Sequence, residues 1–229
     1  GDRDEIVIEL PNYMQIWGVA GAFGLKRKSF WLRAEDNRWV PDIEELKEKV
    51  SRKTLAIAVC TPNNPTGSVM KSEHLRAIAE IAEDCGAIVL SDEIYRGAEL
   101  SGDMSPSMWD YSDNVIVTGG LSKAFAAPGL RIGWVVSKVQ GKAGEMWAYT
   151  DYTSISPSLL GDRLGQIVMQ PSVKERIIER SRNILRRNWT IVSEWLKNNA
   201  DLFECIPPEA SAICLVRYEH ELDSEELAE

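Results

Sequence analysis

Two segments of the sequence, 54–60 and 87–90, lack the alternation of polar and apolar residues that marks a half-exposed strand. Strands of this kind are covered on both faces, as in a parallel sheet. Between them, apolar residues at helical spacing predict a helix over 72–84, and Gly86 is a helix stop signal. The order strand, helix, strand is therefore the strongest constraint on the fold.

Further strands and helices are expected on either side of this unit. The apolar runs predict strands at 6–10, 29–32, 115–117 and 132–136, with helices over 12–23 and from 41 onward. Strands that alternate with helices indicate an α/β fold, with a mainly parallel sheet sandwiched by helices.

The pattern changes after Ser137. Pro171 begins a helix predicted to reach Asn198, about 42 Å long by helix rise, and a strand is expected over 212–218. We therefore expect a large domain over 1–170, followed over 171–229 by a connecting helix and part of a smaller α+β C-terminal domain. The chain opens close to a strand and closes on an abbreviated helix start, so we expect a fragment that lacks both ends.

Composition excludes several classes of function. The net charge of −9 comes without a basic stripe, which argues against nucleic acid as a partner, and no apolar run is long enough to cross a membrane. The cysteines form no Cys-x-x-Cys pair, which is typical of core residues in a reducing cytoplasm, where we expect the protein to reside. The spacing of His74 and His220 gives no metal site.

Polar loops follow three of the predicted strands, at 61–67, 91–95 and 118–123. In parallel sheets, ligands bind beyond the carboxyl ends of the strands. We therefore expect these loops to form a single site.

The turn that follows the 115–117 strand carries Lys123 and Arg131. A lysine partly dehydrated by Leu121 and Phe125 can act as an amine nucleophile, and an arginine beside it suits a phosphate. A reactive amine next to a phosphate site is what pyridoxal phosphate requires. Taken alone, the pattern also fits an ordinary solvated lysine.

The two other loops carry further polar candidates. Asn64 lies in a loop bounded by prolines, and Asp92 and Tyr95 share a face if the segment after their strand is one helical turn. Each motif also has a purely structural interpretation, as a turn or as a helix cap.

In this order and spacing, the three motifs resemble the class I/II aminotransferases, the fold-type I pyridoxal phosphate enzymes, from Pro11 to about Tyr218. The resemblance implies that Lys123 forms a Schiff base with pyridoxal 5′-phosphate and then moves protons as a general acid and base. It implies that Asp92 pairs with the pyridine nitrogen, and that Tyr95 and Asn64 hydrogen-bond the ring oxygen.

The resemblance assigns the phosphate to Ser122 and Arg131, and a stacking contact on the ring face to Tyr13. It also implies an amino acid and a 2-oxo acid as substrates, and a homodimer for the full-length protein. Where the family usually has a phosphate-binding serine, shortly before the lysine, this sequence has Gly120. We expect either the Thr118 hydroxyl or a backbone N–H to take its place.

Other functions on the same scaffold stay open. A lyase, a cyclase or a deaminating oxidase would share Lys123 and Asp92. The Gly-Gly-Leu-Ser-Lys segment resembles that of arginine-handling relatives, and Asp151 would then face a basic amino acid. The third alternative is a non-catalytic pyridoxal phosphate-sensing domain of a transcription regulator.

Overall fold

The computed structural model describes residues 3–219, 221 and 223–228. In this part of the chain, a seven-stranded sheet has the order β3-β2-β1-β4-β5-β6-β7. Its strands are β1 (Glu5–Leu10), β2 (Lys26–Glu35), β3 (Arg38–Pro41), β4 (Thr54–Cys60), β5 (Ile88–Asp92), β6 (Val115–Gly120) and β7 (Gly133–Ser137). Neighbouring strands from β2 to β6 run parallel, and β3 and β7 add antiparallel edges. The predicted α/β fold with a mainly parallel sheet is confirmed.

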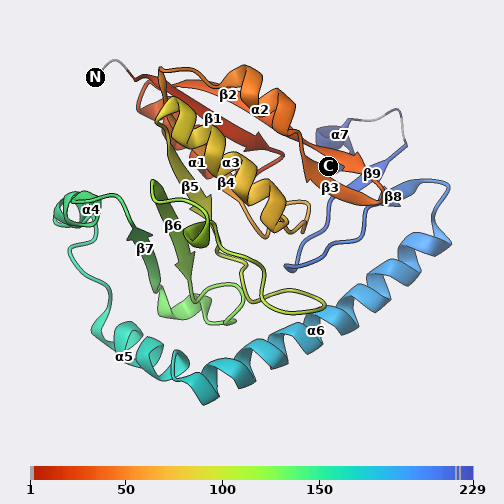
Figure 1. The fold of residues 1–229 in the computed structure, drawn as a ribbon. Helices are drawn as coiled ribbons and strands as arrows, with labels where there is room; N and C mark the ends of the chain where they lie inside the picture. Colours follow the sequence, from red (N-terminus) through yellow and green to blue (C-terminus); the bar gives the residue numbers. More distant parts are fainter. Residues whose placement is uncertain (1–2, 220, 222, 229) are drawn as a thin grey trace.

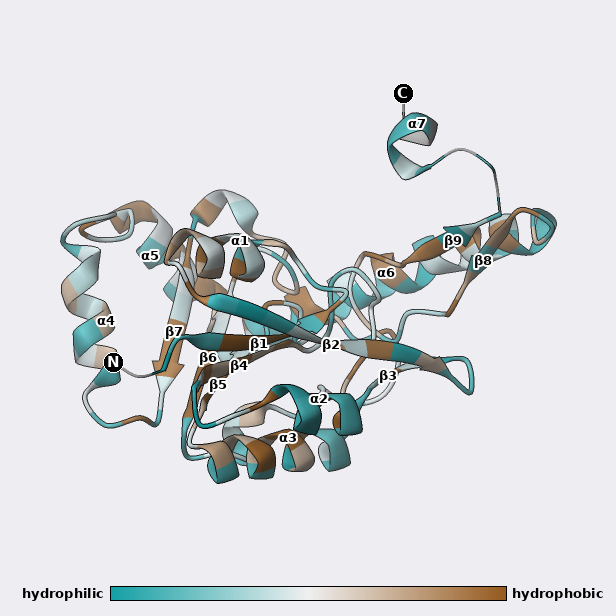
Figure 2. Ribbon diagram, turned by 90° about the horizontal axis from the view of Figure 1, so that it is seen from above, coloured by the Kyte–Doolittle hydropathy of each residue, from teal (hydrophilic) through white to brown (hydrophobic). Residues whose placement is uncertain are grey.

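Helices cover both faces of this sheet (Figures 1 and 2). The α-helices of the described residues are α1 (Gln15–Ala22), α2 (Ile43–Lys49), α3 (Ser72–Cys85), α4 (Lys142–Thr150), α5 (Leu159–Val168), α6 (Pro171–Asn198) and α7 (Ser224–Ala228). Figure 2 shows the sheet edge-on, with α2 and α3 on one side and α1 on the other. None of the helices in the described residues is long and apolar enough to cross a membrane.

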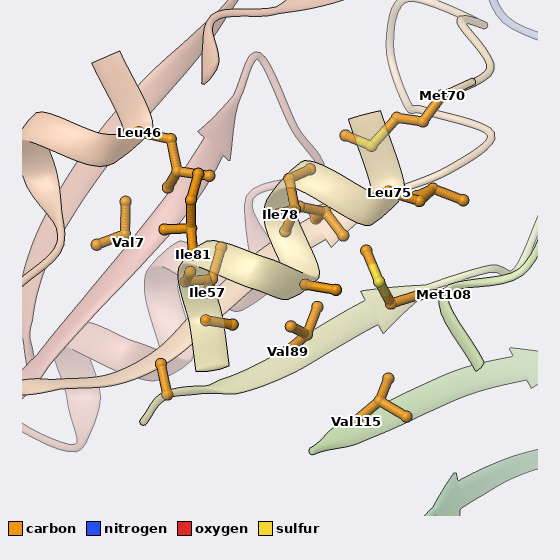
Figure 3. Packing of buried hydrophobic residues seen from close by; sticks show 14 of the residues in the cluster. Val7, Leu46, Ile57, Met70, Leu75, Ile78, Ile81, Val89, Met108 and Val115 are labelled. Carbon is orange, nitrogen blue, oxygen red and sulfur yellow. The ribbon is translucent and has the colours of Figure 1, made fainter. Parts of the chain in front are cut away.

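The core explains why the central strands carry no polar alternation. On one face, Val7, Ile57 and Val89 pack against Leu75 and Ile78 of α3 (Figure 3). A second cluster on the opposite face contains Ile6, Ile8, Ala20, Ala56 and Ala58. Since β1 and β4 contribute to both clusters, an apolar side chain is needed at nearly every position.

Helix α3 ends where its sequence predicts. Gly86 adopts a left-handed conformation with φ of 72°, and its N–H bonds back to the Ala82 and Glu83 carbonyls. Only a residue without a Cβ enters this conformation at little cost, so the glycine stops the helix.

The β2–β3 hairpin was not among the predicted elements. Asp36 and Asn37 form its turn with φ values of 47° and 59°, a conformation that Asp and Asn tolerate better than most residues. As a result β2 extends to Glu35, beyond the expected 29–32, and β3 pairs with it.

The C-terminal region also differs from expectation. Within the described residues, β8 (Phe203–Cys205) and β9 (Val216–Tyr218) form a separate two-stranded sheet. The strand expected over 212–218 is therefore wrong in its first half. The segment just before it is bound to the loop 61–67 instead of to a strand, because the N–H groups of Glu209 and Ala210 both donate to the Gly67 carbonyl.

Candidate functional site

The carboxyl ends of β4, β5 and β6 lie side by side, because these strands are parallel neighbours. Two hydrogen bonds continue the ladder at this edge: Thr61 N–H donates to the Asp92 carbonyl, and Glu93 N–H donates to the Thr118 carbonyl. The loops that carry the expected site residues therefore leave the sheet together. This arrangement matches the expectation of a common edge.

Lys123 and Tyr95 meet at this edge. The Lys123 Nζ lies 5.6 Å from the centroid of the Tyr95 ring, a cation–π distance. Tyr95 is only 4% exposed, whereas Lys123 is exposed. The amine is thus positioned by a buried ring while remaining accessible to a ligand.

Asp92 has two unequal carboxylate oxygens. Its Oδ1 accepts hydrogen bonds from the Thr118 hydroxyl at 3.0 Å and from the Ile94 N–H at 3.1 Å. No described residue donates to Oδ2. Burial raises the pKa of this carboxyl, and the two hydrogen bonds oppose that rise. The carboxyl can therefore accept a further N–H on the free oxygen.

Tyr95 lies in the turn that follows β5. Backbone hydrogen bonds from Arg96 to Glu93 and from Ala98 to Tyr95 shape this segment, which keeps Tyr95 close to Asp92. Burial raises the pKa of the Tyr95 phenol, and the nearby Cys60, Asp92 and Tyr13 raise it further. Tyr95 therefore keeps its proton and can donate a hydrogen bond.

In the loop 61–67, Asn63 rather than Asn64 maintains the backbone shape. The Asn63 Nδ2 donates to the Pro11 carbonyl, and its Oδ1 accepts from both the N–H and the hydroxyl of Thr66. The half-buried Asn64 side chain makes no hydrogen bond to the described residues, so its amide is available to a ligand. The sequence pattern alone does not distinguish the roles of the two asparagines.

The structure does not bring every expected residue into contact. Arg131 is exposed, has a left-handed backbone, and donates from Nη1 to the Pro128 carbonyl of its own turn. Ser122 is half-buried, and Tyr13 is 56% exposed. No hydrogen bond links these three side chains to Lys123 or Asp92 within the described residues.

Two glycines precede the lysine loop. A Cβ added at Gly120 would lie 3.1 Å from the Ile132 carbonyl oxygen and 3.1 Å from Ile94 Cδ1, so a serine there would require a shift. The Thr118 hydroxyl is bonded to Asp92 rather than directed at a separate anion site. The Thr118 hydroxyl is therefore already engaged, and the replacement of the serine by a backbone N–H stays a prediction.

Glu9 is a buried group that the sequence analysis missed, although it is the one charged residue in the run 6–10. Its Oε2 accepts the Cys60 N–H at 2.7 Å, and its Oε1 has no partner among the described residues. Burial raises the pKa of Glu9 to about 8. This carboxyl joins the carboxyl ends of β1 and β4.

A metal centre is not found in the part of the chain that the structure describes, where no group of three metal-ligating side chains gathers. His74 is half-buried on α3, and His220 lies outside the described residues.

Comparison with known proteins gives a consistent result. The family model described as aminotransferase class I and II matches residues 1–229. The glutamate-pyruvate aminotransferase AlaA of Haemophilus influenzae is 35% identical over 59% of the chain and 34% of its own length. Capreomycidine synthase of Streptomyces vinaceus is 28% identical over 99% of the chain and 57% of its own length.

Solved structures share the fold. A PLP-dependent aminotransferase from Streptococcus suis superposes with a TM-score of 0.89 at 31% identity, covering 98% of this chain and 58% of that protein. The aspartate aminotransferase of Thermus thermophilus, solved with maleate, gives a TM-score of 0.83 at 25% identity, covering 91% and 54%. The chain thus spans between a third and somewhat more than half of these proteins.

Proposed function

The chain belongs to the class I and II aminotransferase family, and on this premise we propose that it carries the pyridoxal phosphate site of an aminotransferase acting on an amino acid and a 2-oxo acid. The observation that supports this most is the meeting of Lys123, Tyr95 and Asp92 at one edge of the sheet. An amine, a phenol and a carboxylate from adjacent strand ends match the groups that this cofactor needs.

The residues present fit the cofactor. Asp92 offers a free oxygen for an N–H, Lys123 offers an exposed amine, and Asn64 offers an unbonded amide. When bound, pyridoxal phosphate supplies a ring that accepts the electron pair left when a proton leaves the α-carbon of the amino acid.

Each residue then has a role that follows from its chemistry. Lys123 would be the amine of the proposed Schiff-base attachment, and it would also take and return the α-carbon proton. The Asp92 carboxylate would keep a proton on the ring nitrogen. Tyr95 would donate from its hydroxyl to the ring oxygen, and Asn64 would donate to the same oxygen from its amide.

The phosphate would be held by Ser122, Arg131 and the backbone N–H groups of the lysine turn. For this, the Arg131 guanidinium leaves the Pro128 carbonyl, which it contacts from an exposed position. Tyr13 would cover one face of the ring. A stacked aromatic contributes about 0.5–1.5 kcal/mol beyond its burial.

The test is amino transfer by the protein as its gene encodes it, purified with pyridoxal phosphate. We expect an absorbance band of the bound cofactor, loss of that band when an amino acid donor is added, and formation of glutamate from 2-oxoglutarate or alanine from pyruvate. A protein that retains no cofactor would contradict the proposal.

A second function has a specific observation in its favour. Similarity to capreomycidine synthase extends over 99% of the chain, which keeps open a cyclase, lyase or oxidase acting on a basic amino acid such as arginine. Asp151, proposed to face such a substrate, is exposed at the C-terminal end of α4. Consumption of arginine with release of ammonia, and without amino transfer, would favour this alternative. Cofactor binding without turnover of any amino acid would favour a sensing domain.

Three further expectations remain proposals. We propose a division into a cofactor-binding part over 1–170 and a connecting helix with a smaller domain over 171–229. We also propose a homodimer for the full-length protein and a cytoplasmic location.

A further inference from the structure

Thr118 and Asp92 are register partners in neighbouring parallel strands, β6 and β5. Residues paired in this way direct their side chains to the same face of the sheet. The Thr118 hydroxyl accordingly reaches Asp92 Oδ1 at 3.0 Å, across the strand boundary.

We propose that Thr118 is a positioning residue for Asp92: its hydroxyl holds Oδ1 and thereby leaves Oδ2 as the oxygen that pairs with the ring nitrogen of the cofactor. The inference rests on the proposed function, and it adds a residue that acts through Asp92 rather than on the cofactor itself.

The two donors to Asp92 converge on the same oxygen. Ile94 N–H comes from the turn that follows Asp92, and the Thr118 hydroxyl comes from the next strand. An aspartate held only by its own turn can still rotate about its side-chain bonds. A donor from a second strand removes that rotational freedom, so the Oδ2 atom points in a single direction.

Thr118 is itself firmly placed. Its carbonyl accepts the Glu93 N–H, and on its other side it pairs with Val135 of β7. Its β-branched side chain has few allowed rotamers. A strand paired on both edges therefore presents the hydroxyl at a fixed point, which is what a positioning residue requires.

A direct role of Thr118 on the phosphate is less well supported. The hydroxyl has a single proton, and that proton is donated to Asp92. The proposed phosphate ligands Ser122 and Arg131 lie farther along the chain, past the end of β6.

The test compares Thr118→Val, which keeps the shape and loses the donor, with Thr118→Ser, which keeps the donor. The measurement is the dissociation constant of pyridoxal phosphate in the protein as its gene encodes it. Because an unrestrained Asp92 side chain must then be ordered on binding, affinity should fall about three- to tenfold in Thr118→Val, whereas Thr118→Ser should stay within about twofold of the wild type. Thr190→Val is the control, because that exposed hydroxyl bonds only the Arg186 carbonyl of its own helix among the described residues.

A carbon NMR titration of Asp92 without cofactor gives a second readout. We expect the pKa of Asp92 to rise in Thr118→Val and not in Thr118→Ser, because the serine hydroxyl still stabilises the charged form. If Thr118→Val does not fold, Thr118→Ala takes its place in both measurements.

If Thr118→Val binds pyridoxal phosphate as tightly as the wild type and its Asp92 keeps the wild-type pKa, the positioning role is overturned. The proposed function then stays intact. Equal losses in the valine and serine variants would also overturn it, since the hydroxyl would then not be the cause. A wild-type protein that binds no pyridoxal phosphate would instead overturn the proposed function.

Discussion

The Lys123 amine lies over the ring of Tyr95, with 5.6 Å between Nζ and the ring centroid. The two residues belong to loops after β6 and β5, and the pairing of these strands brings them together. Burial fixes the tyrosine, and the exposed lysine remains accessible to a ligand. An accessible amine is thus combined with a rigid support, which is the arrangement that the proposed function requires.

Replacing Tyr95 by phenylalanine should separate the ring from its hydroxyl. The buried ring and its contact with Lys123 are kept, so we expect unchanged stability. The lost hydrogen bond to the cofactor should weaken pyridoxal phosphate binding about two- to tenfold. Tyr149→Phe is the matched control, because the Tyr149 side chain is 71% exposed. Identical cofactor affinity in Tyr95→Phe and the wild type would exclude the proposed role of the hydroxyl.

Glu9 should make the protein less stable as the pH rises. Its pKa is raised from 4.5 to about 8 in the folded state, so the folded protein retains a proton that the unfolded chain releases. The stability linked to this proton is fully present below about pH 4.5 and is lost as the pH rises toward 8. The upper bound on the loss is about 5 kcal/mol, from the size of the shift.

Urea unfolding of Glu9→Gln at pH 5 and pH 8.5 tests this. The glutamine oxygen can still accept the Cys60 N–H, and the variant has no proton to lose. We expect it to be more stable than the wild type at pH 8.5, with a smaller difference at pH 5. Glu48→Gln, on the exposed side of α2, serves as the control. An equal pH dependence in Glu9→Gln and the wild type would show that Glu9 ionises normally.

Gly119 should not tolerate a side chain. A Cβ at this position would lie 2.5 Å from Nε1 of Trp134, its partner in β7. The indole also meets Phe125 in an edge-to-face contact with centroids 6.4 Å apart, so moving it disturbs the lysine turn. We expect Gly119→Ala to cost about 1–3 kcal/mol in denaturant unfolding. Gly144→Ala, in open space on α4, should be neutral or slightly stabilising, and equal effects of the two would refute the steric argument.

The ion pair between Arg182 and Glu99 should contribute more to the free energy of unfolding than the ion pairs on the surface do. Arg182 of α6 bonds the Glu99 carboxylate and the Gly97 carbonyl, and both charged side chains are largely buried. Arg182→Met would leave the Glu99 charge buried without its partner, at a cost of about 3–5 kcal/mol. The exposed pair of Arg217 and Glu219 gives the control, Arg217→Met, for which we expect less than about 1 kcal/mol. Equal unfolding free energies for the two variants would contradict this ranking.

The sequence predicted those elements whose signal is local. The apolar run 54–60 and the helix 171–198 have the observed bounds, and Gly86 ends α3 as expected. The gathering of polar loops at one sheet edge could also be predicted, because parallel strands bring their carboxyl ends together.

Contacts that depend on strand register could not be predicted in this way. The pairing of Thr118 with Asp92 requires knowing which residue of β6 lies opposite which residue of β5. The burial of Glu9 depends on its contact with Cys60, far along the chain. The short strand β8 lacks a long apolar run, and the orientation of Arg131 depends on its left-handed backbone.

The most direct test of the proposed function is to locate the covalent attachment of the cofactor. The protein as its gene encodes it would be loaded with pyridoxal phosphate, reduced with sodium borohydride, digested and analysed by mass spectrometry. We predict that the phosphopyridoxyl group is found on Lys123, and that Lys123→Ala carries none. A label on another lysine, or none on the wild type, would contradict the assignment of this site.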